Sequence, residues 1–402
     1  MSQSQSYIYN TRDMSANNNF SNTINSKLIN TDNEKYKKLP DILFKYFKNK
    51  NLKYNLEQRI FYYKHIVDRL KNISNKQCLT EYSINSKKNN DVKGYSIDNT
   101  VFLTKKFGSI SKYGYIYIAS IKNEIGKYPI ASKIMINNSV NIFEANTNLK
   151  ITDKIVKTMI SRHFIFTYKV IVCDKITNKN IPDIIINKKY YVLLNELARG
   201  DLKQLCSNKV FLKNDNVLYN VFIQIILSIS TFHHLGFIHG DCHWGNFLYQ
   251  INYETNKNSY HHYNIYGKNY YLKSCEYTMF IYDFGFAKKI KSVNTTYIEE
   301  DYVRIINAFR NRKIEPRSWI SVDYNLPSDN VGIFAKSFKK AIYDNMLAKK
   351  NNTLFLENLT NDIIIPILLK APNNIFVNKL PPNATIINKK PYYINKKIVI
   401  KD

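Results

Sequence analysis

Residues 237–250 read FIHGDCHWGNFLYQ and place several polar side chains inside a strongly apolar stretch. His239, Asp241, His243 and Asn246 lie between a Phe-Ile pair on one side and a Phe-Leu pair on the other. Burial of a polar group without a partner costs about 1–3 kcal/mol in protein mutational data. Strand or helix packing does not require such a cluster. The side chains therefore either form a private hydrogen-bond network or carry out chemistry.

The sequence around this stretch predicts a mixed α+β fold. Upstream, β-branched and aromatic runs broken by glycine predict a hairpin over residues 100–123 and a strand over 128–136, followed by a helix over 141–160 and strands over 166–174 and 190–198. This order favours an antiparallel sheet. Beyond residue 200 the pattern becomes helical, with an apolar helix over 216–237 and short strands over 246–251 and 278–287.

Composition divides the chain into five segments. Residues 1–40 are rich in Ser, Asn and Thr and predict a disordered tail, and residues 41–98 predict a helical extension (41–73) followed by a linker (74–98). We expect a small antiparallel-sheet lobe over 99–198 and a mainly helical lobe over 199–370. Residues 371–402 are expected to be a basic tail, and residues 250–278 a polar, tyrosine-rich insertion.

The charge balance favours polyanionic partners, but weakly. The 402 residues include 59 Lys+Arg against 31 Asp+Glu, a formal net charge of +28. Because the lysines are dispersed along the chain, a solvated surface is favoured over a dedicated nucleic-acid surface, and binding to nucleic acid is expected to be weak. The N-terminus has no apolar leader and no run of 18 apolar residues occurs, so no membrane partner is expected.

The five cysteines occur without a C-x-x-C pair. Their odd number and spacing argue against a disulfide framework or a structural zinc site, and favour a reducing, intracellular compartment.

Four residues have the chemistry that nucleotide phosphoryl transfer requires. Asp241 would orient the hydroxyl nucleophile, and Asp283 with Asn246 would supply oxygen ligands for Mg²⁺, a cation that prefers oxygen. Lys133, at the end of a predicted strand, would steady the nucleotide phosphates. Positioning and charge neutralisation are the main tasks in this chemistry.

In this order and spacing the residues resemble the protein-kinase-like superfamily over about residues 100–310. Asp241 and Asn246 match the catalytic-loop pattern of an Asp followed five residues later by an Asn, and residues 283–285 are D-F-G. Residues 130–133, I-A-S-K, match the V-A-I-K strand, and residues 193–202, LLNELARGDL, resemble the interlobe hinge. The resemblance implies a two-lobed fold that binds ATP and Mg²⁺, with Asp241, Lys133, Asn246 and Asp283 as catalytic residues and Asn246 and Asp283 on the metal. The nucleotide-contacting residues that it implies are Gly114, Ser109, Ser111, Ile116, Ala131, Lys133, Glu144, Glu196 and His243.

Several positions depart from the family pattern. Ser109 and Ser111 stand where the first two glycines of the glycine-rich loop belong. The acidic partner of Lys133 is either Glu144, only eleven residues later, or Asp153, at the more usual spacing but with a shorter side chain. His243 stands two residues after Asp241, where protein kinases often have Lys, and no A-P-E follows the D-F-G.

The remaining side chains of interest are assigned structural places. His239 is expected to bond backbone near the D-F-G turn, and Trp244 and Cys242 to be packing residues. His261 and His262, in the insertion, are expected at the surface.

Two classes of function follow from these patterns. One is an active kinase whose acceptor is a Ser or Thr hydroxyl of a protein, with a small-molecule hydroxyl as the alternative acceptor. The other is a non-catalytic, kinase-shaped binding protein, favoured by the degenerate glycine loop and the missing A-P-E. The H-G-D-C-H loop resembles that of atypical kinases and of kinase-like proteins of large AT-rich DNA viruses, which implies the cytoplasm of a host cell, or a virion, as the location.

Overall fold

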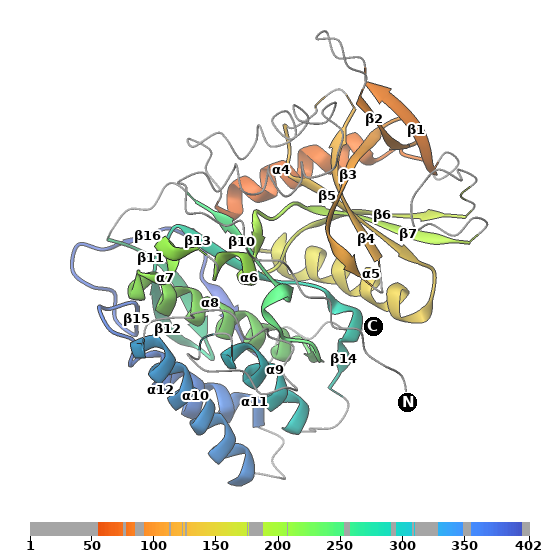
Figure 1. The fold of residues 1–402 in the computed structure, drawn as a ribbon. Coiled ribbons are helices and arrows are strands. Elements are labelled where there is room, and N and C mark those ends of the chain that lie inside the picture. The colour runs from red at the N-terminus through yellow and green to blue at the C-terminus, as the bar shows by residue number, and fades with distance from the viewer. Residues whose placement is uncertain are drawn as a thin grey trace.

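The computed structural model describes residues 55–395 apart from 75–77, 85–91, 112–113, 123, 125–126, 175, 177–187, 207, 253–257, 291–294, 308, 310–328 and 349–354. Its N-terminal part is an antiparallel sheet with helices packed against it, and its C-terminal part is mainly helical with small sheets (Figure 1). The mixed α+β class predicted from the sequence is thereby confirmed. The disordered tail predicted for residues 1–40 lies outside the described residues.

The main sheet has seven strands in the order β1-β2-β3-β4-β5-β7-β6, and every neighbouring pair is antiparallel. Strands predicted for the hairpin, for 128–136, and for the two later segments are all present. Their bounds are β1 Cys78–Ile84, β2 Val92–Ile97, β3 Val101–Ser111, β4 Gly114–Ile121, β5 Ile130–Ile136, β6 Thr167–Cys173 and β7 Tyr190–Glu196.

The linker predicted over residues 74–98 is wrong, because β1 and β2 extend the sheet there. Leu79 and Ile97 are fully buried in the core. The polar run between the two strands dominated the composition and hid these apolar positions.

Two helices cover the sheet. The predicted extension helix is α4 (Leu56–Leu70), which begins at Asn55, whose side chain accepts a hydrogen bond from the Gln58 amide. Helix α5 (Ser139–Ile151) begins in the same way at Asn138 and continues as a π-helical turn, η2 (Thr152–Val156). Helix α5 packs on β6 and β7, and this places its buried face next to the strands that carry the candidate site.

The C-terminal part is built around α8 (Asp215–His234), the apolar helix predicted from the sequence. It is long and apolar enough to cross a bilayer, but 94% of its most apolar window is buried inside the fold. Gly236, at φ +86°, follows its C-terminus in the left-handed conformation that glycine adopts readily. The helices around it are α6 Leu202–Leu205, α7 Lys209–Leu212, α9 Thr295–Asn307, α10 Asp329–Ala348, α11 Phe355–Asn358, η5 Leu359–Ile364 and α12 Ile365–Leu368.

Two small sheets surround the polar stretch of residues 237–250. Strand β10 (Phe247–Ile251) pairs with β13 (Tyr277–Ile281) and β8 (Gly200–Asp201), and β9 (Phe237–Ile238) pairs with β14 (Lys288–Lys289). The polar loop therefore begins at the end of one strand and ends at the start of another.

The insertion and the expected C-terminal tail form one further sheet. Strands β11 (Ser259–Ile265) and β12 (Lys268–Lys273) are a hairpin, to which β15 (Phe376–Val377), β16 (Thr385–Ile386) and β17 (Tyr392–Ile394) are added. The prediction of a basic tail over 371–402 is therefore wrong for residues 371–395, which contain these strands. Buried Phe376, Tyr392 and Ile394 supply the apolar contacts that their Asn- and Lys-rich surroundings concealed.

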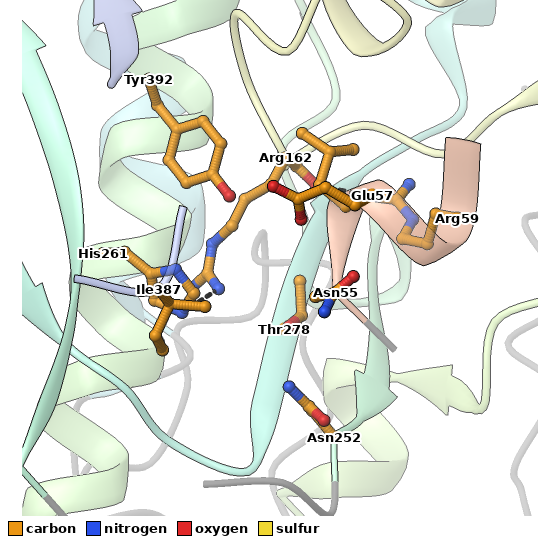
Figure 2. Close-up of a pocket in the computed structure, with 10 residues that line it drawn as sticks. Asn55, Glu57, Arg59, Arg162, Asn252, His261, Thr278, Ile387 and Tyr392 are labelled. Atoms are coloured by element: carbon orange, nitrogen blue, oxygen red, sulfur yellow. Dashed lines mark hydrogen bonds between the residues drawn. The ribbon is translucent and has the colours of Figure 1, made fainter. Parts of the chain in front are cut away.

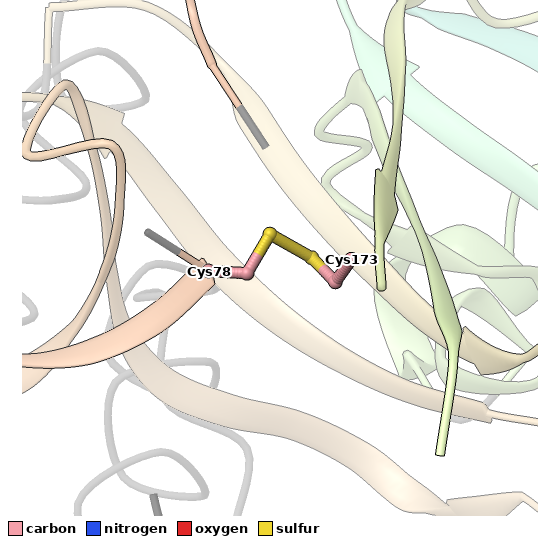
Figure 3. The surroundings of a disulfide bond; sticks show 2 residues. All are labelled: Cys78 and Cys173. Atoms are coloured by element: carbon pink, nitrogen blue, oxygen red, sulfur yellow. A yellow bond between two sulfur atoms is a disulfide. The ribbon is translucent and has the colours of Figure 1, made fainter. Parts of the chain in front are cut away.

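A disulfide joins Cys78 of β1 to Cys173 of β6, with 5.7 Å between the Cα atoms (Figure 3). These strands are the two opposite edges of the seven-stranded sheet, so the sheet curls until its edges meet. The expectation that the cysteines form no disulfide is wrong for this pair. A separation of 95 residues leaves no spacing pattern from which the pairing could be predicted.

Candidate active site

The polar loop is held at both ends and at its backbone. After β9, Gly240 has φ +76°, and a Cβ at this position would lie 2.9 Å from the Phe286 carbonyl oxygen. Only a glycine allows this close approach without strain. A 3₁₀ turn, η3 (Trp244–Asn246), then leads into β10, with Trp244 buried as expected for a packing residue.

Asp241 has both carboxylate oxygens engaged. Its Oδ1 accepts a hydrogen bond from Arg304 Nη1 at 3.0 Å. Its Oδ2 accepts from Asn246 Nδ2 at 3.3 Å and lies 3.5 Å from His243 Nε2. Asn246 Nδ2 also donates to the Asp241 carbonyl at 2.9 Å, so the residues at the two ends of the Asp-x4-Asn pattern fix one another.

Lys133 brings together groups that are far apart in the sequence. Its ammonium lies 2.6 Å from Glu144 Oε1 on α5 and 2.9 Å from Asp283 Oδ1, which follows β13. Lys133 and Glu144 are buried, whereas the Asp283 side chain is 37% exposed. Asp153, the other candidate partner, is instead paired with Lys157 at 2.8 Å on the exposed side. The structure thus decides the choice of partner in favour of Glu144.

Burial and the shared ammonium of Lys133 determine the direction of the pKa shifts of Lys133, Glu144 and Asp283. Burial disfavours a charged lysine, but Asp283 and Glu144 outweigh it, so the pKa of Lys133 lies above its ordinary value. Burial also raises the pKa of Glu144, and Lys133 opposes that rise. For Asp283 burial acts in the same direction, but Lys133 outweighs it and the pKa of this carboxyl lies below its ordinary value. Asp283 is therefore ionised at neutral pH.

A backbone hydrogen bond links the segment that carries Asp283 to Asn246. The Tyr282 amide donates to the Asn246 carbonyl at 2.9 Å, which sets Asn246 beside the residue that precedes Asp283. Asp283 has φ +65°, a left-handed conformation that is uncommon outside glycine and that occurs at functional sites.

Within the described residues, no group of three or more His, Cys, Asp or Glu side chains is placed to hold a metal. Asp283 and Asn246 carry the oxygen atoms that Mg²⁺ prefers, and this ion is commonly held by one or two carboxylates together with substrate phosphates and water. The residues present therefore fit a magnesium–nucleotide site.

The two loop histidines have different places. His239 is fully buried and its Nε2 bonds the Tyr282 carbonyl at 2.9 Å, the backbone contact near the D-F-G turn that was predicted for it. His243 Nδ1 accepts from the Gly245 amide at 3.0 Å. Burial lowers the pKa of His243 although Asp241 opposes this, so the ring is neutral at pH 7.

Apart from Glu144 and His243, the residues predicted to surround the nucleotide lie on the neighbouring strands β3, β4, β5 and β7. Ile116 of β4 pairs in register with Lys133 of β5, and Ala131 pairs with Ile118. A Cβ at Gly114 would lie 2.8 Å from the Ile134 carbonyl oxygen, so β4 can approach β5 this closely only with glycine there. Ser109 and Ser111 belong to the backbone of β3, where the register with β4 is irregular between Phe107 and Ser111. The side chains of both serines lie outside the described residues.

Glu196 ends β7 and is committed to a contact with α4. Its carboxylate accepts from Arg59 Nε at 2.8 Å and Nη2 at 2.7 Å, and from the Phe166 amide at 3.1 Å. Arg59 also donates to the carbonyls of Arg162 and Phe164 at 3.0 and 2.6 Å. Arg59 and Glu196 are 1% and 2% exposed, so the side chain of Glu196 faces the interior.

A pocket lies between the start of α4, the insertion hairpin and β17, away from Lys133 and Asp241 (Figure 2). Arg162 and His261 meet there, with 2.6 Å between Nη1 and Nε2. His261 was expected at the surface but is buried, because its hairpin packs against the added strands of the C-terminal segment. His262 retains an exposed contact with Asn269. The pocket contains none of the residues predicted for catalysis.

Three important residues of the site carried no prediction. Arg304 and Asp301 lie on α9 and contact the polar loop, and Arg59 holds Glu196. The spacing of Asp301 and Arg304, three residues apart on one helix face, was the available signal. For Arg59, which lies 137 residues from Glu196, the sequence offered none.

Comparisons with known proteins give limited help. No protein-family model matches the sequence, and no curated protein matches it. Among solved structures the chain is similar to the BubR1 kinase domain, with 14% sequence identity and a TM-score of 0.39, over 79% of this chain and 98% of that chain. A similarity this distant says nothing about activity or substrate.

Proposed function

We propose that this chain is an ATP-dependent phosphotransferase that acts on a hydroxyl, with a Ser or Thr side chain of a protein as the acceptor. The observation that carries the proposal is the buried ammonium of Lys133 held between Glu144 and Asp283. Buried charges are costly unless paired, so a lysine that joins a strand, a helix and a loop is a specific arrangement. Strongly perturbed ionisable groups of this kind cluster at functional sites.

Each residue has one task in this mechanism. When bound, Mg²⁺–ATP supplies the phosphoryl group and a metal ion that neutralises charge on it. Lys133 holds nucleotide phosphate oxygens by charge, and Glu144 keeps its ammonium in place. Asp283 and Asn246 supply the oxygen ligands.

Asp241 orients the acceptor hydroxyl, because its carboxylate accepts hydrogen bonds from Arg304 and Asn246 while it remains partly exposed. Most of the rate acceleration would then come from positioning and from electrostatic stabilisation, since this chemistry asks for little covalent participation by the protein.

Nucleotide binding is the first test. With Mg²⁺ and ATP at a hundredfold excess over Kd, a ligand that binds only the folded state stabilises it by about 2.7 kcal/mol. We expect that shift in thermal unfolding, and we expect Asp283→Asn and Lys133→Met to lose it. Lys157→Met is the matched control, because it removes a Lys–Asp contact of similar length, 2.8 Å against 2.9 Å, between exposed side chains.

Phosphate transfer is the second test. Asp241→Asn is expected to keep nucleotide binding and to lose transfer to a protein acceptor mixture. Transfer to small-molecule hydroxyls alone would identify a small-molecule kinase. Binding without any transfer would identify a non-catalytic, kinase-shaped binding protein. Absence of Mg²⁺-dependent nucleotide binding at millimolar ATP would refute the proposal as a whole.

A further inference from the structure

Helix α9 carries two charged side chains, one turn apart, that both contact the polar loop. The Asp301 carboxylate accepts hydrogen bonds from the amides of His239 and Gly240 at 2.7 and 2.8 Å, and it lies 2.9 Å from His233 Nε2. Arg304 Nη1 donates to the Gly240 carbonyl and to Asp241 Oδ1, both at 3.0 Å. One helix thus holds the backbone just before Asp241 and also its carboxylate.

The Arg304 contact bears on one specific degree of freedom, the rotation of the Asp241 carboxylate. With Oδ1 bonded to Arg304 and Oδ2 near Asn246 and His243, the side chain is restrained from opposite sides. Without Arg304, the Asn246 contact at 3.3 Å would be the remaining hydrogen bond to the carboxylate within the described residues. That contact is long for an N–H···O bond, so it would restrain the carboxylate poorly.

Because the Arg304–Asp241 ion pair is partly exposed, it can fix the orientation of the Asp241 carboxylate while it adds little to the stability of the fold. Arg304 is 35% exposed and Asp241 is 21% exposed. An ion pair that is this accessible to solvent contributes about 0–1 kcal/mol to folding. Asp301, by contrast, is fully buried. Removal of Arg304 should therefore leave the fold intact, whereas removal of Asp301 should not.

Charge is the second reason to single out Arg304. The loop itself has His243 two residues after Asp241, and an imidazole carries no permanent charge. The guanidinium group of an arginine, by contrast, is permanently charged in proteins. Among the arginines in the described part of the chain, Arg304 forms the ion pair with Asp241.

We propose that Arg304 is a positioning residue for Asp241: it fixes the carboxylate in the orientation that receives the acceptor hydroxyl and places a permanent positive charge beside the transferred group. The proposal rests on the proposed phosphotransferase function. The permanent positive charge then comes from Arg304 on α9, which follows the D-F-G segment in the sequence. It does not come from the loop between Asp241 and Asn246.

The test compares Arg304→Met and Arg304→Lys with wild type in steady-state transfer assays. For Arg304→Met we expect kcat to fall about 10- to 100-fold, because misplaced catalytic groups cost up to about 10²-fold in rate. The KM for ATP and the thermal midpoint should be nearly unchanged. Arg304→Lys should recover part of kcat, since Lys keeps the charge but not the planar fork, and added methylguanidinium should restore activity to an Arg304→Ala variant.

Arg69→Met is the matched control, because Arg69 is 53% exposed and forms an ion pair with Glu124, which is not one of the predicted site residues. This variant should have wild-type kcat. A fall in kcat of less than threefold for Arg304→Met, or an equal rise in the KM for ATP, would overturn the positioning role.

A crystal structure of Arg304→Met gives a readout that does not depend on activity. The Asp241 carboxylate is expected to rotate away from its wild-type orientation or to occupy two conformers. An unchanged single conformer would refute the proposal. If wild-type protein neither binds Mg²⁺–ATP nor transfers phosphate, the proposed function fails, and this structure still decides whether Arg304 holds Asp241.

Discussion

Replacement of Arg59 by Met should destabilise the protein strongly, although Arg59 is not among the residues predicted for catalysis. The wild-type side chain makes two short hydrogen bonds to Glu196 and two more to backbone carbonyls, and both ionic groups are almost fully buried. Met fills most of the volume but removes both guanidinium bonds from the Glu196 carboxylate, which also accepts a hydrogen bond from the Phe166 amide at 3.1 Å. Loss of one partner from a buried pair costs about 3–5 kcal/mol.

A double-mutant cycle makes the reasoning testable. The change Glu196→Met should also be costly, because it removes the carboxylate that accepts two hydrogen bonds from the buried guanidinium. The double variant Arg59→Met with Glu196→Met should cost less than the sum of the two, by more than about 1 kcal/mol, since interacting neighbours depart from additivity by about 0.5–3 kcal/mol. The measurement is urea unfolding followed by circular dichroism, with m-values compared across the set.

The control for this cycle is Lys71→Met at the end of the same helix. Lys71 pairs with Asp68, and both side chains are about two-thirds exposed, at 63% and 66%. Substitutions at such exposed positions change the free energy of unfolding by no more than about 0.5 kcal/mol. A cost below about 1 kcal/mol for Arg59→Met at unchanged m-value would refute the inference that α4 is an integral part of the fold.

Four further predictions follow from other features. Cys78→Ser should lower the unfolding free energy by up to about 4.7 kcal/mol, the loop-entropy value for a loop of about 100 residues, and reductant should lower the thermal midpoint of wild type but not of this variant. Asp301 has a pKa below its ordinary value, because bonds from His233 and the loop amides outweigh burial. The ionised Asp301 carboxylate therefore stabilises the fold above about pH 4, and this stabilisation is lost as pH falls through the pKa of the folded state. The difference in unfolding free energy between wild type and Asp301→Asn should accordingly shrink below about pH 4. Gly114→Val should weaken nucleotide binding, as measured by calorimetry, because its Cβ would clash with the Ile134 carbonyl and push β4 from β5. Binding to duplex DNA should fall with salt at a slope of about −0.9 per neutralised phosphate and vanish near physiological salt; tight binding at 200 mM would contradict a solvated-surface origin of the +28 charge.

The sequence predicted those parts of the fold and site that depend on short-range patterns. The strands from β3 to β7, helix α8 and the Asp241–Asn246 loop follow from hydrophobic periodicity and from a fixed spacing of five residues. Contacts made by the tertiary fold carry no such pattern. Arg304 and Asp241 are 63 residues apart, and Cys78 and Cys173 are 95 apart. At these separations the sequence gives no sign that the two residues of either pair are in contact.

Composition misled the sequence analysis where polar residues surround a few buried ones. The short strands β15 and β17 lie in a region of Asn, Lys and Pro, and only Phe376, Tyr392 and Ile394 reveal that they are packed. A strand of two or three residues is too short for alternation to be recognised. The choice between Glu144 and Asp153 was open for a related reason: eleven residues along the chain say nothing about which helical face turns toward Lys133.

The bridge between Cys78 and Cys173 makes a covalent ring of the chain from β1 to β6. Lys133 and Glu144 lie inside this ring, whereas Asp241 and Asp283 lie outside it. A protease that cuts once between residues 78 and 173 would therefore give two fragments that stay linked, and they would separate on a gel only after reduction. Nicked protein would keep its lysine–glutamate pair tethered to the rest of the chain, and limited proteolysis under oxidising and reducing conditions would report directly on the state of this bond.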